Sequence, residues 1–128
     1  MSEIVETLSH DGLNITVTRS ARGFTMSWQG MSDTRDPDRI LGPFMKRLAR
    51  ELKGKPITID FSAFEYMNSA AVSPIIQFIK LLDAGETPTM LVYDTNVAWQ
   101  RVNYSCMKAI ARTLRHVEVR EASAPVES

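Results

Sequence analysis

The 128-residue sequence has one cysteine, two histidines, no net charge and no long apolar run. The single Cys106 cannot form an intramolecular disulfide, which fits a reducing compartment, and we expect it to be a small buried residue. Because 15 Lys and Arg balance 15 Asp and Glu, no net field favours nucleic acid or an anionic membrane. No apolar stretch approaches the roughly 20 residues that span a bilayer, and the N-terminal MSEIVETLSHDG lacks the features of a signal peptide. The composition predicts a cytoplasmic protein without nucleic-acid or membrane partners.

Candidate catalytic and metal-binding groups are also scarce. His10 and His116 are the only imidazoles, and Cys106 has no histidine next to it in the sequence. No spacing of Cys, His or carboxylates matches a metal site, and no glycine-rich phosphate loop follows a predicted strand. We therefore expect no catalytic residues, no metal and no cofactor.

Apolar periodicity predicts one domain over residues 13–120 with the element order ββαβαβαβ. Residues 1–12 are expected to be a flexible lead-in that ends at the turn dipeptide Asp11-Gly12, and residues 121–128 a disordered tail. The first helix has a start signal at Asp36-Pro37 and an interruption or restart at Gly42-Pro43. Alternating or short apolar runs predict strands at 13–18, 24–28, 56–62, 89–93 and 116–120, and helical spacing predicts helices at about 37–52, 69–84 and 97–114.

Alternation of strands and helices predicts an α/β fold with a mixed sheet. Right-handed crossovers between parallel strands place the helices mainly on one face of that sheet. Met45, Met67, Met107, Trp28 and Phe44 lie on patterned faces, which favours packing in the core over a ligand pocket. Trp99, early in the third helix, is either a half-buried structural residue or part of a partner-binding surface.

The segment ITIDFSAFEYMNSAAVS, residues 57–73, carries the strongest functional signal. An alternating strand is followed by a short turn that delivers Asn68-Ser69 to the start of an apolar helix. A helix start offers unpaired N–H groups and the positive end of the dipole, which tolerate a phosphoryl group. Ser69 has small neighbours, Ala70 and Ala71, which leave room for a kinase to approach its hydroxyl.

Two simpler roles for these serines remain open. Ser69 can merely cap the helix, which is a common use of serine. Ser73-Pro74 is an equally good helix start, in which case Ser69 lies on a loop or a distorted turn before the regular helix.

The segment resembles the STAS domain of bacterial anti-sigma-factor antagonists. Asp60-Phe61-Ser62 is similar to the strand end of that family, and 68–73 is similar to its helix-opening Asp-Ser-Ser/Thr-Gly-Leu-Gly motif. Gly30 and Asp33 resemble a second feature, a Gly-x-x-Asp step that lies near the phosphorylation loop. The order of elements matches over residues 13–120.

This resemblance implies a partner-switching protein that acts in signal transduction and transcription regulation. The unphosphorylated protein is expected to bind a serine kinase of the histidine-kinase-like fold, which often doubles as an anti-sigma factor. Phosphorylation at Ser69 is expected to control that binding, and a PP2C-type phosphatase to reverse it. The implied partner-binding residues are Asp33, Asn68, Ser69, Ala70 and Ser73.

The sequence also departs from the family motif. Asn68 replaces the motif Asp, and Ala71 and Ser73 replace the two glycines, so the turn must suit residues that carry a Cβ. Two alternatives therefore stand beside the switch: a scaffold that binds a regulatory enzyme without phosphorylation, and a small-ligand sensor.

Overall fold

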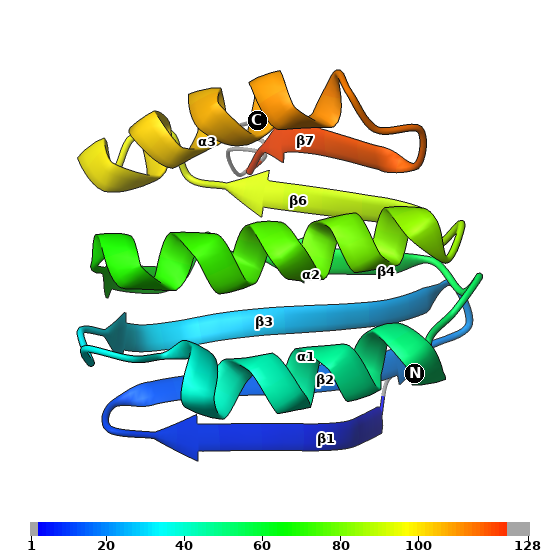
Figure 1. Cartoon of the computed structure of the whole chain (residues 1–128), viewed down its shortest axis with the longest axis horizontal. Helices are drawn as coiled ribbons and strands as arrows, with labels where there is room; N and C mark the ends of the chain where they lie inside the picture. Colours follow the sequence, from blue (N-terminus) through cyan, green and yellow to red (C-terminus); the bar gives the residue numbers. More distant parts are fainter. Residues whose placement is uncertain (1–2, 123–128) are drawn as a thin grey trace, which may run out of the picture.

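The computed structural model describes residues 3–122, which form one layer of sheet and one layer of helices (Figure 1). Helices α1 (Asp38–Glu51), α2 (Val72–Ala84) and α3 (Ala98–Ala111) lie on the same face of the sheet (Figure 1). Over the described residues, the opposite face carries no helix. The predicted fold class, a mixed sheet with helices mainly on one face, is confirmed.

The strands form one mixed sheet with the order β1-β2-β3-β4-β6-β7, while β5 pairs with the end of β3. The first three strands are antiparallel, and β3, β4, β6 and β7 run parallel to one another. The bounds are β1 (Glu3–His10), β2 (Leu13–Ser20), β3 (Gly23–Ser32), β4 (Ile57–Asp60), β5 (Phe64–Met67), β6 (Thr89–Tyr93) and β7 (Val117–Glu121).

The expectation of a flexible lead-in over residues 1–12 is wrong for residues 3–10, which form β1. Asp11 and Gly12 both have positive φ, 45° and 87°, which matches a tight hairpin turn rather than the end of a loose segment. A bulge between Ile4 and Glu6 interrupts the alternation of β1, which hides the strand from a period-two pattern. Glu6 pairs with Arg47 of α1, so β1 is also attached to the helix layer.

β5 is a second strand that was not predicted. It lies within the segment expected to be a short turn. β4 pairs with Phe24–Ser27 of β3, and β5 pairs with the later residues Gly30–Ser32 of the same strand. The two short strands therefore follow each other along β3, separated by the turn at 61–63. This arrangement carries the chain along β3 to the start of α2.

The first helix runs through the predicted interruption. α1 continues from Asp38 to Glu51 with Pro43 inside it, and its N-terminal cap residue is Pro37, which makes no side-chain capping bond. Pro43 lacks an N–H, so it leaves the carbonyl of Arg39 without a helical donor. Burial of Leu41, Phe44 and Leu48 against the sheet compensates for that lost bond.

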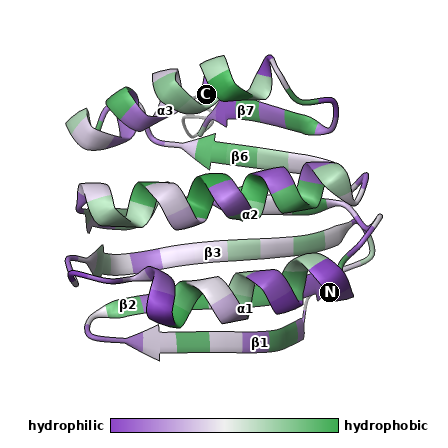
Figure 2. Ribbon diagram, viewed as in Figure 1, coloured by the Kyte–Doolittle hydropathy of each residue, from purple (hydrophilic) through white to green (hydrophobic). Residues whose placement is uncertain are grey.

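The core lies between the helices and the sheet. The methionines and aromatic residues expected in the core are buried there, with Trp28 at 1% exposure and Met107 at 1%. α1 and α2 alternate between hydrophobic and hydrophilic bands along their length, as amphipathic helices do when one side packs on a sheet (Figure 2).

The chain end was predicted only in part. Glu121, expected to begin the disordered tail, is the last residue of β7. Residues 123–128 lie outside the described part of the chain. Between residues 3 and 122, no helix combines the length and apolar character needed to cross a bilayer.

Candidate functional site

Asn68 joins the two segments that form the candidate site. Its backbone N–H donates to the carbonyl of Ser32 at 2.9 Å, and its Nδ2 donates to the carbonyl of Thr34 at 2.9 Å. These bonds hold the loop that follows β3 against the residue that precedes Ser69. The Oδ1 of Asn68 is buried and accepts no hydrogen bond from residues 3–122.

Ser69 is exposed and lies on a distorted turn before the regular helix, but the alternative helix start at Ser73-Pro74 is wrong, since α2 has Ala71 as its cap residue. Ser69–Ala71 form a 3₁₀ turn, and the regular helix α2 begins at Val72. The N-terminal cap residue of this turn is Asn68, not Ser69. The hydroxyl of Ser69 forms no hydrogen bond within residues 3–122, so it is not used as a cap.

The other predicted partner-binding residues near Ser69 differ in how much of their surface is exposed. Asp33 is exposed and lies between Ser32 and Thr34, the two residues whose carbonyls accept bonds from Asn68. Ser73 is exposed one helical turn after Ser69, and its Oγ accepts a long bond of 3.5 Å from Gln77. Ala70 is half-buried and therefore presents less surface than the serines.

An exposed apolar pair next to this site was missed by the sequence analysis. Met31 and Tyr66 are register partners on β3 and β5, with 41% and 46% of their surfaces exposed. Met31 directly precedes Ser32, and Tyr66 lies two residues before Asn68. Methionine and tyrosine are enriched in protein interfaces, so this pair extends the surface available to a partner. The pair could not be found from the sequence because β5 was not predicted, and without β5 nothing places Tyr66 beside Met31.

A buried glutamine holds the turn that precedes β5. Asp60 Oδ1 accepts bonds from the N–H and hydroxyl of Ser62, at 2.9 and 2.6 Å. Gln100 of α3 donates from Nε2 to the carbonyls of Phe64 at 3.0 Å and Ser62 at 3.4 Å. The residues that resemble the family strand end therefore fix the path of the chain toward Ser69.

Trp99 and Cys106, both on α3, have different outcomes. Trp99 is half-buried, packs edge-on against Phe64 with ring centroids 5.5 Å apart, and donates from Nε1 to the carbonyl of Glu65 at 2.8 Å. The structural role of Trp99 is therefore confirmed. The expectation that Cys106 is buried is wrong, because it lies on the outer side of α3. Cys106 lies in the sequence between the buried Asn103 and Met107, and helical periodicity did not separate its exposed position from theirs.

The imidazoles and carboxylates do not assemble into a catalytic or metal site in the described chain. His10 ends β1, near the end of the sheet that carries Ser69, whereas His116 precedes β7 at the opposite end. Over residues 3–122, no group of three or more His, Cys, Asp and Glu side chains is placed to hold a metal ion.

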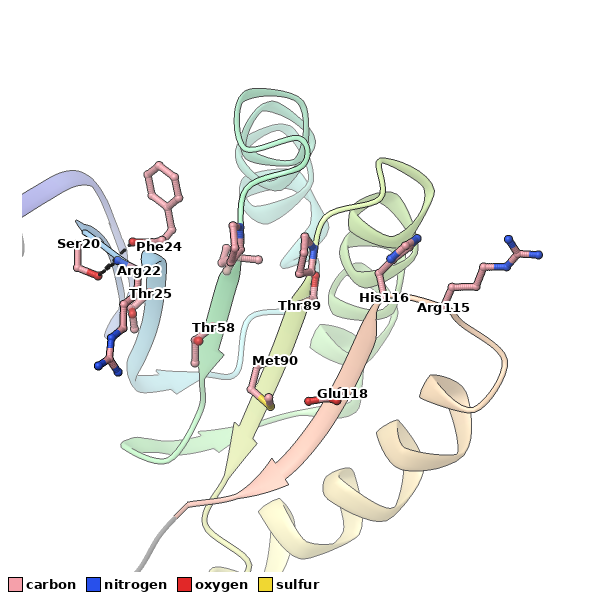
Figure 3. A pocket seen from close by; sticks show the side chains of 14 residues that line it. Ser20, Arg22, Phe24, Thr25, Thr58, Thr89, Met90, Arg115, His116 and Glu118 are labelled. Atoms are coloured by element: carbon pink, nitrogen blue, oxygen red, sulfur yellow. Dashed lines mark hydrogen bonds between the residues drawn. The ribbon is translucent and has the colours of Figure 1, made fainter.

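A groove of about 610 Å³ lies at the end of the sheet opposite Ser69 (Figure 3). It crosses the first residues of β3, β4, β6 and β7, and Arg22 lies at its border in the turn before β3. In Figure 3 its labelled side chains spread apart instead of converging, and the Arg115 side chain extends away from the strands. The groove and the Ser69 surface are therefore separate features of the fold.

Comparison with known proteins gives similarity in structure only. No protein-family model matches the sequence, and no curated protein matches it. A chain in the crystal structure of the diguanylate cyclase SiaD with its activator SiaC, from Pseudomonas aeruginosa, superposes with a TM-score of 0.63 at 16% identity, covering 91% of this chain and 99% of that one. The structure of apo-SiaC gives a TM-score of 0.62 at 15% identity, with 92% and 98% covered.

A third solved structure connects these matches to a named fold. An uncharacterized DUF3478 protein from Shewanella loihica PV-4, described as having a SpoIIAA-like fold, superposes with a TM-score of 0.50 at 12% identity. The aligned region covers 91% of this chain and 92% of that protein. The chain therefore has the SpoIIAA-like α/β fold that its resemblance to STAS domains predicts.

Proposed function

We propose that this chain is a non-enzymatic signalling protein of the anti-sigma-factor antagonist type, controlled by reversible phosphorylation at Ser69. Its unmodified surface around Asp33, Asn68, Ser69, Ala70 and Ser73 binds a protein partner in the cytoplasm. A serine kinase modifies Ser69, and a PP2C-type phosphatase removes the phosphate.

The observation that carries this proposal is that Ser69 is exposed at the start of the α2 segment, with no hydrogen bond from its hydroxyl to residues 3–122. A serine that serves only the fold would hydrogen-bond a nearby group, and within residues 3–122 the hydroxyl of Ser69 does not. The small neighbours of Ser69 leave space for a dianionic phosphate, and the N–H groups at a helix start stabilise its negative charge.

The nature of the partner is supported by fold and surface together. SiaC, which shares this fold, is described as the activator of a diguanylate cyclase, so a SpoIIAA-like chain can bind a signalling enzyme. The candidate partners here are accordingly a kinase of the histidine-kinase-like fold that doubles as an anti-sigma factor, or another signalling enzyme. The exposed pair Met31 and Tyr66 provides apolar contact area beside the charged Asp33.

Phosphorylation would release the partner through electrostatics and steric conflict. A phosphoserine adds about 1.5 to 2 negative charges and three acceptor oxygens. At a desolvated interface, a few kcal/mol of like-charge conflict lowers affinity about a hundredfold or more.

Phosphate mapping tests the modification. Protein isolated from its native cells with phosphatase inhibitors would be digested with trypsin, and the peptide spanning residues 54–80 sequenced by mass spectrometry. We expect phosphate on Ser69. Ser62 and Ser73 lie in the same peptide and serve as internal controls. Phosphate on either of those serines alone, or on none under all growth conditions, would contradict the proposal.

Partner affinity tests the switch. Partners would be taken from kinases and other signalling enzymes encoded beside this chain, and binding measured by calorimetry. We expect Ser69→Glu to weaken binding about a hundredfold, whereas Ser69→Thr and Ser20→Glu, which changes an exposed serine at the opposite end of the sheet, leave it within about tenfold. Equal affinity of Ser69→Glu and the unchanged protein would contradict phosphorylation control.

One alternative has its own support in the sequence. Asn68 stands where the family motif has Asp, and its side chain is used to hold the 32–34 loop. A scaffold that binds a regulatory enzyme without phosphorylation would keep this geometry. It predicts that exhaustive treatment with the kinase leaves partner affinity unchanged.

A further inference from the structure

The loop after β3 is bonded to Asn68, the residue before Ser69, and Arg35 lies on this loop. The register partner of Ser32 on β3 is Met67 on β5, and the N–H of Asn68 donates to the carbonyl of Ser32 at 2.9 Å, so the loop after β3 begins alongside Asn68. The bond from Asn68 Nδ2 to the carbonyl of Thr34 extends this contact further along the loop. Arg35 follows Thr34 directly, as Ser69 follows Asn68.

Arg35 is available to bind a ligand. Its side chain is exposed, and within residues 3–122 its guanidinium forms neither a salt bridge nor a hydrogen bond. By contrast, Arg47 and Arg19 are paired with Glu6 and Glu3.

We propose that Arg35 binds the phosphate of phosphorylated Ser69 and so forms an internal latch between the β3–α1 loop and the start of α2. This inference rests on the proposed function, since it requires a phosphate on Ser69. It goes beyond that function because it assigns the residue of this chain that recognises the modification.

The separation is within reach of an arginine side chain. The residues directly before Arg35 and Ser69, namely Thr34 and Asn68, are joined by a bond of 2.9 Å, and the arginine stem adds roughly three methylene groups before the guanidinium. The planar guanidinium donates two parallel N–H bonds to phosphate oxygens, which makes arginine better suited to this contact than lysine.

Other charges near the loop oppose or share this contact. Asp33 and Asp36 lie on the same loop, and Asp38 and Arg39 lie in the first turn of α1. The carboxylates attract the guanidinium and so compete with the phosphate for Arg35, but a phosphate with about 1.5 to 2 negative charges attracts it more strongly than a single carboxylate does. The first turn of α2 contains no acidic or basic residue that would compete.

Such a latch changes what a partner meets after phosphorylation. The loop that carries Asp33 is then tied to α2 by an ion pair in addition to the two bonds from Asn68. Part of the phosphate charge is neutralised within the chain, and the unmodified arrangement of the docking surface is lost.

The test uses the full chain with phosphoserine encoded at position 69 by stop-codon suppression, so that no kinase is needed. The second pKa of the phosphate, near 6 in the free amino acid, is measured by ³¹P NMR titration. A guanidinium beside the phosphate favours the dianion and lowers this pKa. We expect the pKa to be about 0.5 lower in the unchanged protein than in Arg35→Gln, and the difference to shrink in high salt.

Two matched variants make this measurement specific. Arg22→Gln removes an exposed arginine at the opposite end of the sheet, whose guanidinium has no partner among residues 3–122, and is expected to leave the pKa unchanged (Figure 3). Arg39→Gln removes the other arginine near the loop. Equal pKa values in the unchanged protein and in Arg35→Gln would overturn the latch, as would a shift that is lost in Arg39→Gln instead.

The outcome is independent of the mapping experiment. A latch without native phosphorylation would show the ³¹P shift but no phosphate on Ser69 in cells, and the proposed function would fail alone. Phosphorylation without a latch would show phosphate on Ser69 but no effect of Arg35, and only the latch would fail.

Discussion

Gly30 lies where β3 approaches the first hairpin turn, and its backbone leaves no space for a side chain. Its φ is +80°, and a Cβ at this position would lie 1.9 Å from the carbonyl oxygen of Gly12. That carbonyl also accepts a bond of 3.1 Å from the N–H of Met31. The close approach to Gly12 thus explains why the Gly-x-x-Asp step begins with glycine. The same backbone conformation at Gly30 sets the path of the chain toward Asp33.

We expect Gly30→Ala to lower the free energy of unfolding by at least about 3 kcal/mol, because the Cβ meets backbone that cannot move aside. The measurement is urea denaturation followed by circular dichroism. Gly54→Ala is the matched control: its φ is +77°, but no atom lies within 4 Å of the added Cβ. Backbone strain alone should cost about 1 to 2 kcal/mol there. Equal losses in the two variants would show that the contact with Gly12 is not responsible.

Tyr93 gives a prediction for alkaline pH. Burial raises the pKa of Tyr93 above its ordinary value of 10.0, and the neighbouring Cys106 raises it further. Its hydroxyl donates to Asn103 Oδ1 at 2.8 Å, so the neutral form is the one that fits the fold. Below pH 10 both states keep the proton. Above it the unfolded chain loses the proton and the folded chain retains it, so stability falls as pH rises.

Compared with Tyr93→Phe, the unchanged protein should lose about 1.4 kcal/mol of additional stability between about pH 9 and about pH 11. Denaturation midpoints across that range provide the measurement. A difference between the two proteins that does not change with pH would show that Tyr93 titrates normally when folded.

The sequence predicts single residues best where one pattern decides their environment. Trp28 and Met45 fall on strictly periodic faces, and both are buried. Cys106 lies at the border of the buried face of α3, where periodicity alone cannot separate buried from exposed positions. The contact between Asn68 and Thr34 joins residues 34 positions apart, so no local pattern could reveal it.

At the scale of elements, α3 is fixed to the sheet by buried polar groups as well as by packing. Gln100 has no exposed surface, and its Oε1 accepts a bond of 2.7 Å from the N–H of Asp94. Together with its two bonds to the β4–β5 turn, this side chain satisfies backbone groups from two separate loops. Alanine at this position would leave those groups buried and unpaired.

Gln100→Ala should therefore lower the free energy of unfolding by about 2 to 4 kcal/mol. Hydrogen exchange should also show faster opening at the amides of the turn before β5. Gln77→Ala on the exposed side of α2 is the control, with an expected change within about 0.5 kcal/mol. A small effect at Gln100 would mean that water replaces its bonds.

Elements with an unbroken pattern were predicted almost to their ends, and those with an interruption were not. β6 matches its predicted range of 89–93, because a short, continuous apolar run lies between two turn segments. β1 was missed because its bulge breaks the alternation. β5 was missed because it is short and owes its existence to pairing with the end of β3. Tertiary pairing, which single-sequence patterns do not contain, decides such strands.

For the whole molecule, the parallel arrangement of β3, β4, β6 and β7 separates two surfaces. Ser69 lies where the strands end, and the groove lies where they begin. A switch at Ser69 can therefore alter binding at one end without disturbing the core between them. This requires that a negative charge at Ser69 does not unfold the chain.

We accordingly expect Ser69→Glu to keep the fold and its stability. A carboxylate near a helix start interacts favourably with the helix dipole, by about 0.3 to 1 kcal/mol at low salt. Ser69→Lys should change stability in the opposite direction, and both effects should fade in high salt. Urea denaturation of the three proteins at low and high salt is the measurement. A large loss in Ser69→Glu would show that the hydroxyl is structurally required, and reduced partner binding by that variant could then no longer be assigned to the switched surface.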